Sequence, residues 1–189
     1  MEYRTLTTQA LLERVIGLTA TARWYRGALR PLFELEDPAA TYDIEPLLAA
    51  AELVRRMLEE ELRTRDALSS PQAVRDYLRL YFAGREYESF VVFCLDTKNR
   101  LIHVEEIFRG TLTHTAVYPR ELAKLALAKN AASLICSHVH PSGDSEPSAA
   151  DRILTEHLKK MLALVDVKLL DHLVVAGADV MSFAEQGLV

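Results

Sequence analysis

The chain has 189 residues, of which 50% are apolar, 26% charged and 7% aromatic, and its formal net charge is −5. This length suits one domain with a small extension, and the apolar fraction excludes a disordered or collagen-like chain. No stretch of eighteen apolar residues occurs, and the first twenty residues lack the apolar core of a secretory signal. Cys94 and Cys136 each lie in an apolar run, as buried thiols do, so we expect a cytoplasmic protein.

The negative charge is spread along the chain, with no basic tail and no run of more than two consecutive cations. Non-specific nucleic-acid binding draws mainly on basic charge that meets phosphate. The composition therefore disfavours a protein that coats DNA.

Residues 1–68 are predicted to form a small helical N-terminal domain. Between Leu47 and Leu62 apolar residues recur at helical spacing, and charged residues occupy the other faces. Glu45-Pro46 is expected at the start of this helix, because proline is tolerated in a first turn. Residues 31–46, which contain three prolines and two aspartates, are expected to form a loop.

Residues 69–189 are predicted to form a second domain, which Ser70 and Pro71 open as helix N-cap and first helical residue. Two apolar runs then flank a polar turn and predict a β-hairpin over Ser89–Leu95 and Arg100–Phe108. The following elements are predicted as helix 120–131, strand 133–137, loop 140–147, helix 148–164, strand 167–175 and strand 180–183. Helices interleaved with strands in this way indicate a mixed sheet with helices packed on it.

The stretch that carries chemistry is SHVHPSGDSEPSAAD, from Ser137 to Asp151. His138 and His140 are two residues apart at the end of an apolar strand, so their side chains share one face, about 6–7 Å apart along the strand. Two such imidazoles can reach one metal ion at about 2.0–2.1 Å each, and Asp151, in the first turn of the next helix, offers a third ligand. Two histidines and one aspartate with an open fourth position are typical of catalytic zinc.

Each part of this pattern also has a simpler interpretation. Two histidines separated by one residue are common and usually bind nothing. Ser148 and Asp151 are explained equally well as a helix N-cap with an acidic residue in the first turn, and this role can coexist with metal binding. The whole combination, in a strand–loop–helix context, predicts metal binding.

The spacing of His138, His140, Ser148 and Asp151 resembles the zinc-site signature of the JAMM (MPN/JAB) metalloprotease family, and HPSGD is closest to its RadC-like branch. Other segments of the second domain resemble that branch too: FVVFCLD at 90–96, GTL at 110–112, YPRE at 118–121 and LLDHL at 169–173. The branch usually has HNHPSG, whereas Val139 stands in place of the asparagine here. Because that side chain is expected on the face opposite the ligands, the zinc site should survive.

The resemblance implies a three-layer sandwich with a mixed central sheet and flanking helices, similar to the JAMM and cytidine-deaminase folds. It implies a Zn²⁺-dependent metallopeptidase or isopeptidase, which cleaves an amide bond in a peptide or protein substrate. Glu88 takes the position of the general acid/base, and Glu86, on the same face, remains the alternative. Ser148 would help to stabilise the tetrahedral oxyanion. The metal ligands that it implies are His138, His140 and Asp151.

A second hypothesis is a non-catalytic or nuclease-like protein associated with DNA repair, which binds nucleic acid or a protein partner. Ala51–Arg56 resembles the helix that follows a helix-hairpin-helix, but the residues before it lack the glycines whose amides approach a DNA phosphate. The N-terminal domain is therefore interpreted as a degenerate helix-hairpin-helix, and DNA is disfavoured as a partner. A zinc nucleoside deaminase is rejected, because it needs a Pro-Cys-x-x-Cys motif.

Other polar residues are weaker candidates. His172 lies in an apolar strand and is interpreted as a buried neighbour of the ligands. Asp171 is expected either to orient a site residue or to be structural, and the role of Asp144 is open. Residues 109–119 are predicted to form the lip of a cleft. Three further histidines have no partner at metal-binding spacing and are interpreted as surface or packing residues: His103, His114 and His157.

Overall fold

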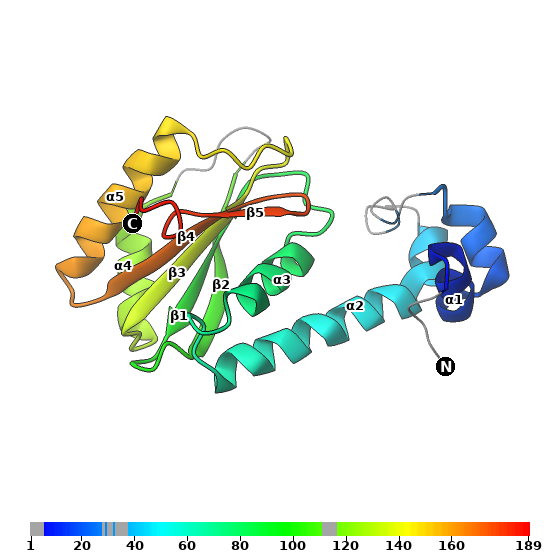
Figure 1. Cartoon of the computed structure of the whole chain (residues 1–189), viewed down its shortest axis with the longest axis horizontal. Coiled ribbons are helices and arrows are strands. Elements are labelled where there is room, and N and C mark those ends of the chain that lie inside the picture. Colours follow the sequence, from blue (N-terminus) through cyan, green and yellow to red (C-terminus); the bar gives the residue numbers. More distant parts are fainter. Residues whose placement is uncertain (1–5, 28, 30–31, 33–37, 111–116) are drawn as a thin grey trace. The chain divides into compact units, whose positions relative to one another are not determined.

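The computed structural model describes residues 6–27, 29, 32, 38–110 and 117–189 (Figure 1). The chain divides into two compact units, Met1–Met57 and Leu58–Val189. Within the described residues, every helix is too short or too polar to cross a membrane.

The first unit begins with helix α1, which spans Thr8–Trp24. The hydroxyl of Thr7 caps this helix by accepting a hydrogen bond from a first-turn amide at 3.2 Å. At Gly17, where φ is 83°, α1 is kinked, because glycine adopts this left-handed conformation without the steric cost of a side chain. The indole of Trp24 donates to the carboxylate of Asp43 at 2.7 Å and so ties the end of α1 to the following helix.

Helix α2 spans Pro38–Thr64 and begins well before Glu45-Pro46, where the sequence placed its start. The loop predicted over residues 31–46 is therefore wrong from Pro38 onward, and residues 31 and 33–37 lie outside the described residues. Pro38 stands at the first helical position, where the missing amide has no helical partner to lose. Pro46 lies inside α2, so one backbone hydrogen bond is missing there.

The last turns of α2 belong to the second unit. Leu62 is buried in a core cluster beneath the sheet, and Leu58 packs against the same cluster. The compact unit that contains the sheet therefore includes the last turns of α2, from Leu58 onward, whereas the predicted domain boundary lies between residues 68 and 69. Helical periodicity reveals an apolar face, but it does not reveal which domain that face packs against.

The second unit is built on a five-stranded mixed sheet with the strand order β2-β1-β3-β4-β5 (Figure 1). Strands β3 and β4 are parallel, and the other neighbouring pairs are antiparallel. The strands are β1 (Ser89–Leu95), β2 (Leu101–Arg109), β3 (Ser133–Val139), β4 (Lys168–Ala176) and β5 (Asp179–Ser182).

Helices cover both faces of this sheet. Helix α3 (Pro71–Tyr81) packs on one face and begins at the predicted Ser70-Pro71 boundary. Helices α4 (Pro119–Ala128) and α5 (Ala149–Ala163) pack on the other. The predicted α/β class, with helices on both faces of a mixed sheet, is confirmed.

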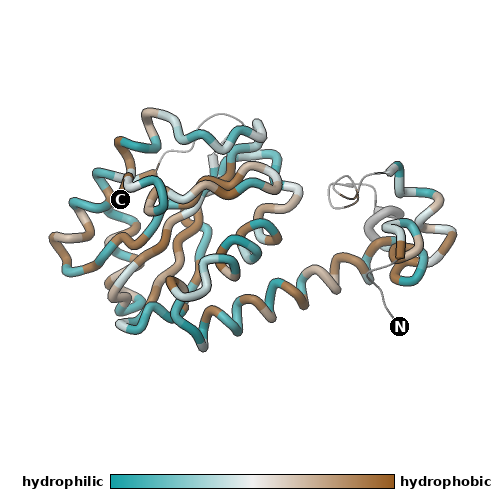
Figure 2. The backbone as a smooth tube through the Cα atoms, viewed as in Figure 1, coloured by the Kyte–Doolittle hydropathy of each residue, from teal (hydrophilic) through white to brown (hydrophobic). Residues whose placement is uncertain are grey.

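The central strands β1 and β3 are buried along their whole length. Figure 2 shows hydrophobic residues along the strands of the sheet and more hydrophilic residues on the helices around it. Side chains alternate between the two core clusters: Val91 and Phe93 face α3, whereas Phe90 and Cys94 face α4 and α5. This alternation determines the face of the sheet on which the polar residues at the end of β3 emerge.

Candidate metal centre

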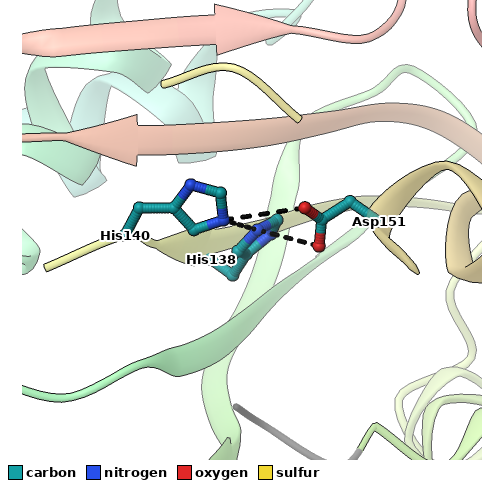
Figure 3. Close-up of side chains that lie close together, drawn as sticks. All are labelled: His138, His140 and Asp151. Atoms are coloured by element: carbon teal, nitrogen blue, oxygen red, sulfur yellow. Dashed lines mark hydrogen bonds and ion pairs between the residues drawn. The ribbon is translucent and has the colours of Figure 1, made fainter. Parts of the chain in front are cut away.

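His138, His140 and Asp151 come from the junction of β3 with α5 (Figure 3). His138 lies in β3, and His140 follows the strand, with its backbone amide donating to the carbonyl of Val175 at 2.8 Å. This bond continues the pairing with β4 past the end of β3, so the two imidazoles stay on one face. Val139 packs into the opposite core cluster, as the alternation predicted.

The three side chains converge on one point. His138 Nε2 lies 2.9 Å from His140 Nε2 and 3.2 Å from an oxygen of Asp151, while His140 Nε2 lies 3.6 Å from the second oxygen. All the ligand atoms lie within 4.8 Å of one another. Ligands at about 2.0–2.1 Å in tetrahedral geometry are themselves about 3.3 Å apart, so this triangle has the size expected around one zinc ion.

The donor set also suits zinc chemically. Two imidazole nitrogens and one carboxylate oxygen leave a fourth tetrahedral position open, which is the pattern of catalytic zinc sites. His138 is only 5% exposed, and its ring stacks parallel to that of Phe90 with centroids 6.2 Å apart. The side chains of His140 and Asp151 each retain 15% exposure, so the group is held firmly on one side and reached by solvent on the other.

The loop after β3 orients His140. Gly143, at a φ of 82°, donates its amide to the carbonyl of His140 at 3.2 Å and closes a turn. The Nδ1 atom of His140 lies 2.8 Å from the backbone carbonyl of Asp144, which can only accept. In the neutral imidazole, Nε2 therefore carries the lone pair and faces the other ligands. Asp144, whose role the sequence left open, therefore contacts His140 through its backbone carbonyl. Its carboxylate accepts from the amide of Glu146 at 2.9 Å.

The start of α5 positions Asp151. The Ser148 hydroxyl accepts from the amide of Asp151 at 3.1 Å, and one carboxylate oxygen, Oδ2, accepts from the Ser148 amide at 2.8 Å and its hydroxyl at 2.6 Å. This is a complete capping box. The other oxygen, Oδ1, faces His138. Asp151 therefore serves as a cap and a candidate ligand at once, through different oxygens.

The electrostatics of the group favour an ionised carboxylate. Burial raises the pKa of Asp151, but when no metal is bound, hydrogen bonds from His138 and His140 protonated on Nε2 outweigh it and hold this pKa well below its usual range. The hydrogen bond with Asp151 in turn raises the pKa of His140 against the effect of burial, assisted by the carbonyl of Asp144 and the charge of Glu88. A cation and protons therefore compete for the same nitrogens.

Glu88 lies directly before β1 and is half-buried, and its backbone carbonyl accepts from the amide of Gly110 at 2.8 Å. Its carboxylate is among the charges that raise the pKa of His140, whereas Glu86 is exposed. The chain bends at Tyr87, so the strand alternation predicted to put Glu86 and Glu88 on one face does not extend to them. Of the two glutamates, the structure favours Glu88 as the one near the ligands.

His172 is fully buried in β4 and touches the ligand group. Its Nε2 atom lies 2.9 Å from Nδ1 of His138, and its Nδ1 atom lies 2.7 Å from the hydroxyl of Thr155. Burial lowers the pKa of His172 well below its usual value. The interpretation of His172 as a buried neighbour is confirmed. Thr155 was missed, although its place one helical turn after Asp151 was a usable signal.

Asp171 has a structural role on the other face of β4. Its carboxylate accepts from the Ser182 hydroxyl at 2.6 Å and from the amides of His172 and Ala184 at 2.7 and 2.9 Å. Burial raises its pKa against these hydrogen bonds. These contacts tie β4 to the end of β5.

Of the remaining candidates, those in the described residues lie apart from the metal centre. His103 pairs with Glu105 on β2 at 2.9 Å, and His157 is exposed on α5. His114 lies outside the described residues, as does most of the predicted cleft lip. The two cysteines are buried free thiols, and burial raises the pKa of Cys94 to about 11.

Comparison with known proteins matches the second unit to one family. A family model for the RadC-like JAB domain matches residues 68–188. A UPF0758 protein of Herminiimonas arsenicoxydans is 63% identical over 141 residues, which cover 75% of this chain and 63% of that protein. A UPF0758 protein of Chromobacterium violaceum is 57% identical over 157 residues, covering 83% and 70% of the two chains.

A third UPF0758 protein, from Nitrosospira multiformis, is 49% identical over 179 residues, covering 95% of this chain and 78% of that protein. The chain thus spans less than two thirds of the length of the Herminiimonas relative and more than two thirds of the length of the other two. The names of these relatives state no activity. With the match over residues 68–188 and the confirmed fold, the chain belongs to the RadC-like JAB-domain family.

Proposed function

We propose that this protein is a zinc-dependent hydrolase that cleaves an amide or isopeptide bond in a peptide or protein substrate. The observation that carries the proposal is the convergence of His138, His140 and Asp151 within 4.8 Å, with solvent reaching one side. Membership of the RadC-like JAB-domain family also supports this proposal, because it is consistent with a JAMM-like fold around the site.

Zinc bound at this site would polarise the substrate carbonyl and lower the pKa of water toward about 7. Glu88 accepts the proton of the water whose oxygen attacks the carbonyl carbon, and it then delivers this proton to the leaving nitrogen as the C–N bond breaks. The Ser148 hydroxyl, which donates to Asp151 Oδ2 in the structure, turns to donate to the developing oxyanion.

Phosphodiesters are the competing substrate class, because activated water attacks phosphorus as well as carbon. Nothing in the described residues favours them over amides, and the net charge of −5 opposes binding of a polyanion. We therefore propose a peptide or protein substrate and treat DNA as the alternative outcome of the test.

Replacing Glu88 with Gln tests the mechanism. The Glu88→Gln variant should keep one zinc ion per chain but lose about 10²–10⁴-fold in turnover of quenched fluorescent peptide and lysine-isopeptide libraries. Glu86→Gln, two residues away, is the matched control and should retain activity. An active Glu88→Gln variant would remove the assigned base.

Two further outcomes would overturn the proposal itself. The first is a wild-type chain that takes up no zinc. The second is a zinc-loaded chain that cuts a single-stranded oligonucleotide but leaves both amide libraries intact.

A further inference from the structure

Three hydrogen bonds connect the two elements that hold the candidate metal ligands. They run from the backbone of Asp151 in α5 through Thr155 to His172 in β4, and from His172 to His138 in β3. The distances are 2.7, 2.7 and 2.9 Å, and Thr155, His172 and His138 are all buried. None of these bonds lies on the open side of the site.

The direction of the first bond is set by chemistry. The carbonyl of Asp151 can only accept, so Thr155 uses its single hydroxyl proton to donate to it. The contact between Thr155 and Nδ1 of His172 then needs a proton on that nitrogen. Thr155 thereby places the proton of a neutral His172 on Nδ1.

The tautomer of His172 determines the tautomer of the candidate ligand His138. With its proton on Nδ1, neutral His172 offers the lone pair of Nε2, which accepts from Nδ1 of His138. His138 then has its proton on Nδ1, and its Nε2 lone pair faces His140 and Asp151. His172 is kept in place by Phe183, whose ring stacks on it with centroids 4.9 Å apart.

We propose that Thr155 and His172 are positioning residues that fix the tautomer of His138 in which Nε2 can bind a metal ion. This inference rests on the metal site of the proposed function but not on its reaction. In the reversed arrangement, His172 would donate from Nε2, and neutral His138 would carry its proton on the nitrogen that faces the metal. Only one donor direction along these three hydrogen bonds therefore leaves Nε2 of His138 free to act as a third ligand.

His140 provides an internal comparison, because its tautomer is set separately by the carbonyl of Asp144. A backbone carbonyl can only accept a hydrogen bond, whereas a histidine partner can donate or accept one. His138 thus needs a second residue to fix the direction, and Thr155 is the residue in contact that does so.

The test compares Thr155→Val with Thr155→Ser in the full chain. Valine keeps the shape of threonine but removes the hydroxyl, while serine keeps the hydroxyl. Zinc affinity, measured by competition with a chromophoric chelator, should fall about 10–100-fold in Thr155→Val, the usual effect of losing an outer partner of a ligand. Thr155→Ser should bind zinc within about threefold of the wild type, an effect well below that range.

A second readout needs no metal. Long-range ¹H–¹⁵N spectra of the metal-free chain distinguish the two tautomers of each imidazole. The wild type should show His172 protonated on Nδ1, and Thr155→Val should shift His172 toward protonation on Nε2. Unchanged near-ultraviolet dichroism of Thr155→Val would exclude misfolding as the cause.

The two proposals fail separately. A chain that binds zinc but hydrolyses nothing overturns the proposed function, and the affinity comparison still decides the positioning role. Wild-type zinc affinity in Thr155→Val, or a wild-type His172 protonated on Nε2, overturns the positioning role even in an active hydrolase.

Discussion

The Nε2 atoms of His138 and His140 face each other across 2.9 Å. When both imidazoles are neutral and donate from Nδ1, two lone pairs point into the same space, which is unfavourable unless a proton or a metal ion lies between them. The carboxylate of Asp151 adds negative charge at the same point. The fold thus holds together three groups that a divalent cation would stabilise.

Zinc should therefore stabilise the folded chain against heat. At a free zinc concentration a thousandfold above Kd, linkage adds about 4 kcal/mol to the free energy of unfolding. His140→Ala removes one ligand and should lose most of the zinc-induced rise in Tm, measured with zinc and with a chelator. His157→Ala removes an exposed histidine of α5 and should keep it. Equal shifts in the two variants would contradict the assigned ligand set.

The sequence predicted these three candidate ligands because their positions follow from local periodicity. Alternation along a strand put His138 and His140 on one face, and helix capping put Asp151 at the start of α5. The partners that orient the ligands were harder to find. His140 is oriented by a backbone carbonyl, which leaves no signature in residue identity, and Thr155 meets His172 only through the packing of α5 on β4.

The boundary between the two units is a second feature that local sequence patterns do not reveal. Leu58 and Leu62 fit the helical pattern that begins at Leu47, so periodicity grouped them with the N-terminal domain. Their packing in a core cluster shared with α3 and the sheet is a tertiary feature that a local pattern does not contain. Local rules predicted most of the elements of the second unit, whereas the assignment of one helix to two units needed the tertiary structure.

Ser148 should matter for both stability and metal binding. Ser148→Ala removes the cap of α5 and the hydroxyl that holds Asp151 Oδ2, which should cost about 0.5–2 kcal/mol of stability in the metal-free chain. Asp151 would also gain freedom to turn away, so zinc affinity should fall. Ser148→Thr keeps the hydroxyl and should preserve both properties. Urea denaturation and chelator competition measure the two effects, and an uncapped variant with unchanged stability would contradict the capping role.

The buried His172 should make the metal-free chain less stable in acid. Because burial lowers its folded-state pKa well below 6.5, the unfolded chain takes up a proton below about pH 6.5 that the folded chain refuses. The free energy of unfolding should then fall by up to about 1.4 kcal/mol per pH unit, until the pH reaches the folded-state pKa. His140, whose pKa is raised, acts in the opposite sense, so the wild type must be compared with a variant.

His172→Gln supplies that comparison, because glutamine keeps a hydrogen-bonding group without titrating in this range. Its stability between pH 7 and pH 5 should depend less steeply on pH than that of the wild type. His157→Gln, at an exposed position, should follow the wild type. Parallel curves for His172→Gln and the wild type would show that His172 does not contribute.

Two leucines of α2 test where the sheet unit begins. Leu62 is 1% exposed and packs beneath the sheet, whereas Leu53, in the same helix, is 65% exposed. Leu62→Ala should lower the free energy of unfolding by about 2–5 kcal/mol through the cavity it leaves, and Leu53→Ala should stay within about 0.5 kcal/mol of the wild type.

The two units can be followed separately. Hydrogen exchange of the β1 and β3 amides reports on the stability of the sheet unit, while fluorescence of Trp24, the only tryptophan, reports on the first unit. Because Leu62 lies in the sheet unit, its replacement should accelerate exchange in the strands. Unchanged exchange in Leu62→Ala would instead place the boundary at residue 68, where the sequence put it.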